Sequence, residues 1–348
     1  MMARLSIDGI GAVGGFGCGV EALRRALRKG HQSAEEEVAG SPLLADTAPL
    51  SEFVAKRAVR RLDHFSKMAL LGAHLALRDA GLPAPVPERT AVVVATGYGP
   101  TRTTFAFLDS VIDDGDACAS PTHFSNSVHN AAAAHVAIQL QATGPSLTVS
   151  QFEMSVPSAL LSAGAWLAEG RVDRVLFGAV DEYCEVLRYC RERFAAEGGE
   201  FGIGPGALPA GEGAAFFLLS RAGEGGGRYG AIEEVRLGRI PDAPIESGTD
   251  LLLLGADGQQ CCDAGYRNLV PAGAPALCHA PLYGCLPVGP AFDLAAAALT
   301  LEQGQAFPAP GVPEDLPVSR VRCLKAGPAG EYGAIVLGRD AGERSEQC

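Results

Sequence analysis

The order of apolar and polar residues predicts a chain in which strands alternate with helices. Continuous apolar runs at residues 91–95 and 251–254 are typical of strands that are buried on both faces. Between Asp63 and Ala80 the apolar positions recur every three or four residues, which predicts an amphipathic helix that Gly81 ends. This alternation favours an α/β fold built in layers.

The same reading divides the chain into two parts. Further helices are predicted at residues 20–29, 101–112, 131–140, 155–169 and 290–303, and further strands at 5–10, 147–150, 174–178, 214–219, 231–237 and 334–337. Residues 31–60 and 121–130 are predicted to be irregular. A glycine cluster at 223–227 separates an N-terminal half, residues 1–222, from a shorter half, residues 229–340, and residues 341–348 form a tail.

Composition narrows the class of protein. The chain has 348 residues, of which 47% are hydrophobic, and this predicts a substantial buried core rather than disorder. Its formal net charge is −12, which argues against binding to a nucleic-acid backbone. No apolar run approaches the ~18 residues of a membrane span, and the first residues lack the features of a signal peptide. We expect a cytoplasmic protein.

Ten cysteines lie at irregular spacings and are predicted to be buried thiols. Cys261, Cys262 and Cys278 could suggest a metal site, but no CxxC pair or nearby series of histidines supports one. The glycine clusters at 11–17 and 223–227 do not fit the dinucleotide fingerprint. We therefore expect neither a metal nor a cofactor.

A tight turn is predicted between the strand at 147–150 and the helix at 155–169. A helix N-terminus has free N–H groups and favours negative charge, and enzymes place a nucleophilic Cys or Ser at such a turn. Glu153 occupies this place. A carboxylate is stable there, but it is a poor acyl acceptor compared with a thiolate.

Several stretches resemble the β-ketoacyl synthase family of the thiolase superfamily. In the first half they are GGFGCGVEALRRALRKG at 14–30, RLDHFSKMALLGAHLALRDAGL at 61–82, PTHFSNSVHNAAAAHVAIQLQATGPSLTV at 121–149 and GEGAAFFLLSR at 211–221. In the second half, LYGCLPVGPAFDLAAAALTLEQGQA at 282–306 resembles the family's lysine and histidine loop with the helix that follows it. The resemblance implies a thiolase-like fold: two pseudo-repeated βαβ-rich halves stacked as an α-β-α-β-α sandwich, here with a shortened second half.

The resemblance also implies a Cys-His-His triad, in which the cysteine carries the acyl chain and the histidines assist decarboxylation of a malonyl unit. Carried over residue by residue, the triad positions are occupied by Glu153, Gly255 and Cys285, and the loop lysine falls on Ala280. Of the seven histidines, His279 alone lies in the second half, where the family needs two. No catalytic residue is therefore expected, and condensation by this chain alone is chemically implausible.

A ketosynthase-like chain without a triad resembles a chain length factor, the silent partner in a type II polyketide or polyene synthase. The resemblance implies a heterodimer, formed through the strand at 147–150, with a catalytic ketosynthase that receives substrates from an acyl carrier protein. The silent subunit would close the acyl tunnel of its partner and limit chain growth. The residues expected to line the tunnel or the interface are Thr101, Thr104, Phe105, Leu108, Phe124, Val128 and His129.

Other interpretations remain open. Glu153 could make the chain a malonyl-carrier-protein decarboxylase, or it could simply cap the helix or form an ion pair. The protein could also be a homodimer that only binds acyl groups. Cys285 could be a displaced nucleophile or an inert buried thiol.

Other polar residues have plain structural interpretations. His129 is expected to be a core histidine, and Asp257 a turn residue. Arg60, Arg61 and Lys67 form a basic group that could contact the acidic carrier protein, although the catalytic partner is the better candidate for that contact.

Overall fold

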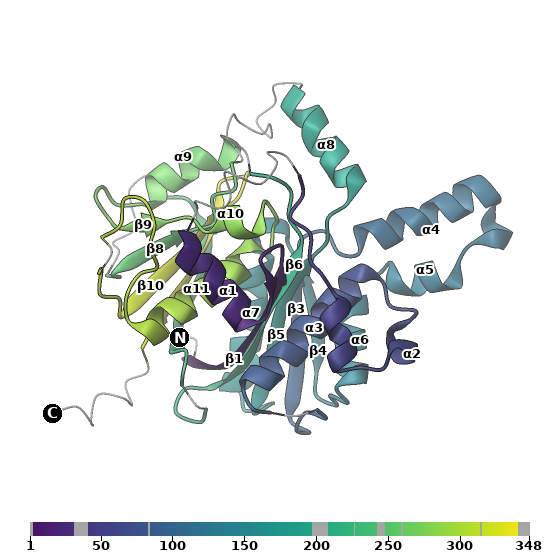
Figure 1. Ribbon diagram of the computed structural model, residues 1–348, viewed down its shortest axis with the longest axis horizontal. Coiled ribbons are helices and arrows are strands. Elements are labelled where there is room, and N and C mark those ends of the chain that lie inside the picture. Colours follow the sequence, from purple (N-terminus) through teal and green to yellow (C-terminus); the bar gives the residue numbers. More distant parts are fainter. Residues whose placement is uncertain are drawn as a thin grey trace.

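Eleven strands of the described chain form one hydrogen-bonded sheet in the order β4-β3-β5-β6-β1-β7-β11-β10-β8-β9, with β2 paired to β1 (Figure 1). The computed structural model describes residues 3–30, 41–82, 84–196, 208–225, 227–241, 248–258, 260–313 and 315–339. The strands are β1 (Leu5–Gly14), β2 (Gly17–Cys18), β3 (Thr90–Thr96), β4 (Ser146–Ser150), β5 (Arg174–Asp181), β6 (Gly213–Arg221), β7 (Ala231–Arg239), β8 (Leu251–Leu254), β9 (Ala276–Leu277), β10 (Arg320–Ala326) and β11 (Glu331–Gly338).

Helices cover the sheet. They are α1 (Val20–Lys29), α2 (Lys56–Val59), α3 (His64–Asp79), α4 (Thr101–Asp114), α5 (Pro121–Asn126), α6 (Ala131–Gln139), α7 (Ser155–Ala168), α8 (Glu185–Ala196), α9 (Gln260–Leu269), α10 (Ala280–Tyr283) and α11 (Gly289–Gln303). Short 3-10 turns occur at Ala48–Glu52, Asp116–Cys118 and Phe152–Met154. No helix in the described part of the chain is long and apolar enough to cross a bilayer.

The same order of pairings occurs twice in the sheet. In the first half β4, β3 and β5 are parallel, and β6 and β1 continue antiparallel. In the second half β9, β8 and β10 are parallel, and β11 and β7 continue antiparallel. The two groups of strands meet where β1 pairs with β7 through Leu5 and Ser6.

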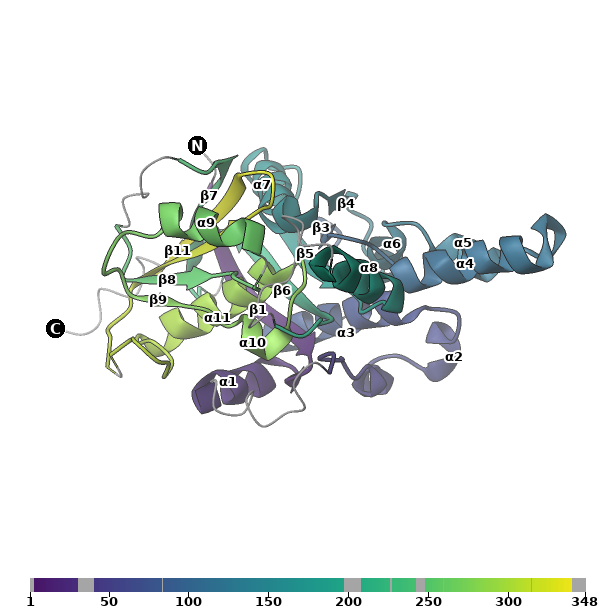
Figure 2. The ribbon, with the colours of Figure 1, turned by 90° about the horizontal axis from the view of Figure 1, so that it is seen from above.

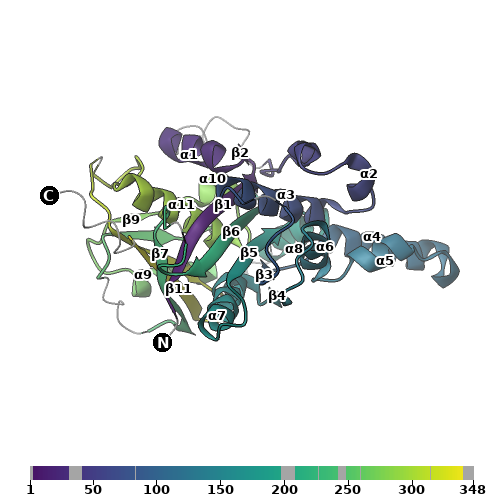
Figure 3. The ribbon, with the colours of Figure 1, turned by 90° about the horizontal axis from the view of Figure 1, so that it is seen from below.

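Side chains along a buried strand point alternately to the two faces of the sheet, and each face packs against a different hydrophobic cluster. On β3, Ala91, Val93 and Ala95 face one cluster, whereas Val92 and Val94 face another. The first cluster also holds α7, α11 and strands of the second half, and the other holds α3 and α6, so helices cover both sides of the first-half strands (Figure 3). A third cluster joins α9 to the outer face of β10 and β11.

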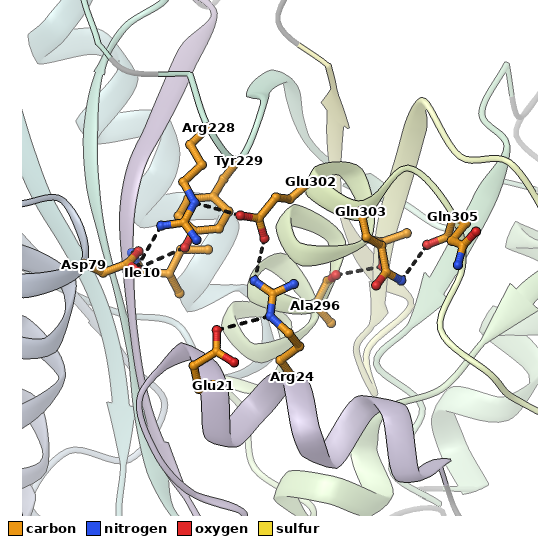
Figure 4. Close-up of polar contacts among 11 residues, drawn as sticks. Ile10, Glu21, Arg24, Asp79, Arg228, Tyr229, Ala296, Glu302, Gln303 and Gln305 are labelled. Carbon is orange, nitrogen blue, oxygen red and sulfur yellow. Dashed lines mark hydrogen bonds and ion pairs between the residues drawn. The ribbon is translucent and has the colours of Figure 1, made fainter.

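A network of ion pairs and hydrogen bonds connects segments that are far apart in the sequence (Figure 4). Glu302, at the end of α11, accepts hydrogen bonds from Arg24 of α1 at 2.5 Å and from Arg228 at 2.7 Å. The Arg228 guanidinium also lies 3.5 Å from Asp79 at the end of α3, which accepts a hydrogen bond from the hydroxyl of Tyr229 at 3.1 Å. The network therefore joins helices of both halves through one short segment before β7.

An arm made of α4 and α5 projects from the body of the molecule (Figure 2). Its base is fixed where the Thr103 hydroxyl donates to Asp63 at 3.0 Å, and where the backbone N–H of Arg102 donates to Glu182 at 2.9 Å. The rings of Phe107 and Phe124 lie 5.4 Å apart and join the two helices. The arm thus keeps its position with little support from the core.

Several sequence predictions need correction. The segment 121–130, predicted to be irregular, contains helix α5, whose N-cap Ser120 accepts a hydrogen bond from the backbone N–H of His123 at 3.2 Å. The pattern also missed α8, α9 and β10, which carry many charged residues. The predicted tail, residues 341–348, lies outside the described residues.

Candidate functional site

The turn that follows β4 holds Glu153 at the start of α7. Phe152 has a φ of 43°, a left-handed value that is uncommon for residues other than glycine. The Ser155 hydroxyl stabilises this turn: it accepts a hydrogen bond from the N–H of Gln151 at 2.8 Å and donates to the carbonyl of Thr96 at 2.9 Å. Glu153 is 5% exposed, so the turn places a buried carboxylate beside a helix N-terminus.

Glu153 does not have the plain structural role expected for it. The N-terminus of α7 has no side-chain cap, and Glu153 forms no ion pair in the described part of the chain. Its charge acts over a distance instead, because it helps to raise the pKa of Lys325. Among the described residues Glu153 therefore neither caps the helix nor forms an ion pair.

A second buried group lies at Cys285, between α10 and α11. The Cys285 thiol donates to Oδ2 of Asp257 at 3.2 Å, and Nζ of Lys325 donates to the same oxygen at 3.0 Å. Asp257 is 3% exposed, so it is a buried ion-pair partner and not the turn residue that the sequence suggested. Burial raises the pKa of the Cys285 thiol far above its usual range, which favours the inert, protonated form.

The ion pair occupies the space next to Gly255. Burial alone would lower the pKa of Lys325, but the carboxylate of Asp257 raises it well above its usual range, so this lysine is charged. Its Nζ also donates to the carbonyl of Gly255 at 2.9 Å. A Cβ atom built on Gly255 would lie 3.0 Å from the Lys325 side chain, so a larger side chain at this position would have little free space.

Asp293 of α11 lies within reach of the same charges. Its carboxylate accepts a hydrogen bond from the Tyr283 hydroxyl at 2.8 Å, and the side chain is fully buried. Burial raises the pKa of Asp293 to about 7, and the nearby Lys325 opposes that rise. The centre therefore holds three carboxyl groups, Glu153, Asp257 and Asp293, around one buried lysine.

A hollow opens beside Cys285, below α8. Its lining residues are Tyr98, Asp181, Glu182, Tyr183, Cys184, Leu187, Arg188, Arg191, Ala210, Gly211, Cys285, Leu286 and Pro287. The carboxylate of Asp181 accepts hydrogen bonds from the Thr96 hydroxyl at 2.7 Å and from backbone N–H groups of Gly97 and Tyr98. These hydrogen bonds hold Asp181 in place in the wall of the hollow. Burial raises the pKa of Asp181 to about 6.

The residues expected to line an acyl tunnel lie along the arm and at its base. Leu108 on α4, Phe124 on α5 and Val128 are 42%, 60% and 44% exposed. Thr101, Thr104 and Phe105 are half-buried at the start of α4, and the Thr104 hydroxyl donates to the carbonyl of Ser127 at 3.1 Å. Leu108, Phe124 and Val128 are thus exposed apolar side chains in the chain alone, as is typical of a contact with another protein.

His129 lies in this region but not in the core, where the sequence analysis placed it. It is exposed, and its ring contacts Gly99, where a Cβ atom would lie 2.9 Å from the ring. Gly99 has a φ of 68°, so glycine is favoured here by both the space and the backbone conformation. His129 thus covers the turn that precedes α4.

Strand β4 forms one edge of the sheet. It pairs with β3 on one side, and no described strand pairs with its other side. The N–H of Val92 donates to the carbonyl of Pro145 at 3.0 Å. Because backbone groups alternate in direction along a strand, the N–H and C=O groups of Leu147 and Val149 also point toward β3. The backbone groups of Ser146, Thr148 and Ser150 are then directed to the open edge, which can accept another strand.

Two further expectations concern a metal site and a group of basic residues. Among the residues that the structure describes, no group of three or more His, Cys, Asp or Glu side chains is placed to hold a metal ion. Cys278 donates to the carbonyl of Ala256 at 3.0 Å, whereas the side chain of Cys261 lies outside the described residues. Arg60 and Arg61 are exposed next to α2, and Lys67 is half-buried on α3.

Sequence reasoning missed Asp257 and Lys325 as partners. They are separated by 68 residues, and no local motif links them. A single lysine within the otherwise apolar end of β10 was the available signal, because a buried lysine requires a counter-charge.

Comparisons with known proteins agree with this architecture. Residues 33–189 match the family model described as "Beta-ketoacyl synthase, N-terminal domain". No curated protein sequence matches the chain.

Solved structures match nearly the whole chain. "The ishigamide ketosynthase/chain length factor" has a TM-score of 0.75 at 18% identity, over 97% of this chain and 99% of that one. A type II ketosynthase in complex with its acyl-carrier protein, AntDE:AntF, has a TM-score of 0.72 at 14% identity, over 97% and 100%. A β-ketoacyl synthase from Burkholderia phymatum STM815 has a TM-score of 0.72 at 15% identity, over 97% and 100%. The chain has the mixed α/β fold of these ketosynthases.

Proposed function

Because residues 33–189 of this chain belong to the β-ketoacyl synthase family, we propose that the protein is a ketosynthase-like subunit that forms no carbon–carbon bond by itself. It pairs with an active β-ketoacyl-carrier-protein synthase and closes the acyl tunnel of that partner. Its pathway makes a polyketide, a polyene or a fatty acid. The two units of the family fold would be residues 1–222 and a shortened 229–340.

The observation that carries this proposal is the chemistry of the buried centre. Covalent acyl transfer needs a nucleophile that can be activated, and the residue at the start of α7 is Glu153. Cys285 is the nearby thiol, but burial and the charge of Asp257 keep it protonated. Lys325 donates to Asp257 and Gly255, so its ammonium group is already used in the ion pair.

The surface supports the subunit role. β4 and the arm of α4 and α5 lie on the same side of the molecule (Figure 2), and the arm carries exposed apolar side chains. A partner could therefore extend the sheet and cover the arm together. One solved structure with this fold is described as a ketosynthase/chain length factor, which names both members of such a combination. A tunnel wall contributed by Phe105 and Leu108 would then lie at the partner's active site.

The test is reconstitution. The tagged chain is co-expressed with ketosynthases that carry a complete Cys-His-His triad, and the purified proteins receive malonyl- and acyl-carrier protein. We expect this chain alone to form no condensation product, and a matched pair to form product of defined length. Condensation by the chain alone, lost on Glu153→Ala, would overturn the proposal.

A decarboxylase remains the second candidate, because Glu153 is buried at the helix N-terminus without an ion-pair partner in the described region. An ionised carboxylate would repel a malonyl group, and this weighs against the idea. Incubation with malonyl-carrier protein and detection of acetyl-carrier protein by mass spectrometry separates the two. Decarboxylation by wild-type protein but not by Glu153→Ala would establish the enzyme.

A further inference from the structure

The hollow beside Cys285, called here the α8 hollow, is lined by Glu182, a residue with one buried carboxyl oxygen that no described group satisfies. Oε1 of Glu182 accepts the backbone N–H of Arg102 at 2.9 Å, whereas Oε2 has no hydrogen-bond partner within the described chain. Glu182 is 4% exposed, and it lines the hollow. A buried polar atom without a partner is costly, so a molecule that enters the hollow and bonds to this oxygen would be stabilised.

The protonation state of Glu182 sets what it can bond to. Burial raises its pKa to about 8, assisted by the charges of Asp63 and Glu212 and opposed by the hydrogen bond from the N–H of Arg102. At neutral pH Glu182 is therefore a neutral carboxylic acid. Since Oε1 already accepts a hydrogen bond, the O–H is available on Oε2 and can donate to a ligand.

The hollow also contains a cation that pairs with no described residue. Arg191 of α8 is half-buried in its wall and forms no ion pair among the described residues. Arg188, one turn earlier, is different: its guanidinium pairs with Glu185 at 2.7 Å and with Glu192 at 2.6 Å. The carboxylate of Asp181 accepts hydrogen bonds from the Thr96 hydroxyl and backbone N–H groups, so Arg191 is the cation in the hollow that a ligand can pair with.

We propose that the α8 hollow binds a short-chain carboxylic acid as its anion, with Arg191 pairing with the carboxylate and Glu182 donating a hydrogen bond to it. The apolar side chains of Leu187, Leu286 and Pro287 provide a surface for the alkyl chain. The enclosed part of the hollow has a volume of about 80 Å³, which limits it to a small ligand. This site lies in the chain itself and does not depend on the proposed heterodimer.

An amine is the opposite possibility, and the charges disfavour it. The charged and titratable groups around Glu182 include Asp63 at the start of α3, Arg102 on α4, Glu212 on β6, and the groups that line the hollow: Tyr98, Asp181, Tyr183, Cys184, Arg188, Arg191 and Cys285. Asp181 can ionise near neutral pH, but its carboxylate already accepts hydrogen bonds from Thr96, Gly97 and Tyr98. With Glu182 protonated and Arg188 neutralised by its own partners, an ammonium group would face Arg191.

The first experiment is a calorimetric titration of the purified full-length chain near pH 6 with sodium butyrate, using butylammonium chloride as the probe of opposite charge. We expect saturable binding of butyrate with one site, and none of butylammonium. Arg191→Met should weaken butyrate at least ~10-fold, whereas the matched Arg188→Met should change it less than ~2-fold. Thermal unfolding confirms that each variant is folded.

The second experiment uses pH. Butyrate affinity of the wild-type protein should fall as the pH rises through about 8, because ionised Glu182 repels the carboxylate and no longer donates. Glu182→Gln keeps an N–H donor without the charge, so its affinity should stay level over the same range. The proposal fails if butyrate does not saturate, if butylammonium binds more tightly, if both arginine variants lose binding equally, or if Glu182→Gln shows the wild-type pH profile.

Discussion

The thiol of Cys285 and the carboxylate of Asp257 meet at 3.2 Å, and the same carboxylate oxygen receives the ammonium group of Lys325 at 3.0 Å. A charged pair therefore occupies the buried centre beside Cys285. Ion pairs of this kind are sensitive to the loss of one partner, because the other is left charged in a medium of low polarity. This property makes the centre testable by stability measurements alone.

Removal of the lysine should destabilise the protein strongly. Lys325→Met leaves Asp257 without its cation, and we expect a loss of about 3–5 kcal/mol in the free energy of unfolding, measured with urea. The double variant with Asp257→Leu should recover most of that loss, because no charge remains buried. Additive losses in the double variant would show that the two side chains do not interact.

The Cys285 thiol should react slowly with alkylating agents. Its pKa is raised by burial, and the side chain is 9% exposed, whereas Cys118 and Cys190 are exposed. With iodoacetamide near pH 8, peptide mapping should find the two exposed cysteines modified on the order of a hundredfold faster. Equal labelling after denaturation serves as the control, and rapid labelling of native Cys285 would argue for a nucleophile.

Asp293 should make stability depend on pH. In the unfolded chain its pKa is near 4, and in the folded protein it is about 7, so the folded form retains the proton between these values. Its contribution to stability is then greatest below about pH 4 and is lost as the pH rises towards 7. Asp293→Asn can still accept the hydrogen bond from Tyr283 and does not ionise.

The expected result is that Asp293→Asn equals the wild type near pH 4 and exceeds it by a few kcal/mol near pH 8. Thermal unfolding at a series of pH values measures the difference in stability between the variant and the wild type. The other titrating groups contribute equally to both proteins, so they do not affect this difference. A constant difference at all pH values would mean that burial does not shift this carboxyl group.

The elements with the clearest periodicity were predictable from the sequence. β3 is an uninterrupted apolar run, and α3 shows helical spacing from Phe65 to Leu77, so both were located nearly as observed. α8 could not be predicted in this way. Its described residues are mainly exposed, so no buried face requires apolar residues at the spacing of a helix. In β10, Arg322 and Lys325 interrupt the apolar pattern that marks a buried strand.

The candidate site was predictable only in part. Glu153 could be placed at the start of α7, because the strand, the turn and the helix are continuous in sequence. The pair of Asp257 and Lys325 depends on packing between β10 and the segment after β8, which no local pattern reports. The exposure of the arm likewise follows from the tertiary arrangement and not from the helical pattern of α4.

The length of the product should respond to side chains on the arm. If Phe105 closes the partner's tunnel, Phe105→Ala adds volume, and the reconstituted pair should release chains longer by one or more two-carbon units, measured by mass spectrometry. Asp109→Ala, on the exposed side of the same helix, is the matched control and should leave the product unchanged. An unchanged product with Phe105→Ala would remove this residue from the tunnel.

Association with the partner should depend on the backbone of β4. Thr148 directs its N–H to the open edge, so Thr148→Pro removes a donor that a partner strand would use while leaving the bonds to β3 in place. We expect the pair to dissociate on gel filtration while the free energy of unfolding of the chain alone changes little. Thr148→Val keeps the N–H and the strand geometry, and its pair should remain intact. If both variants keep the pair together, the subunits do not meet through this edge, and the exposed side chains of Leu108 and Phe124 become the surface to change.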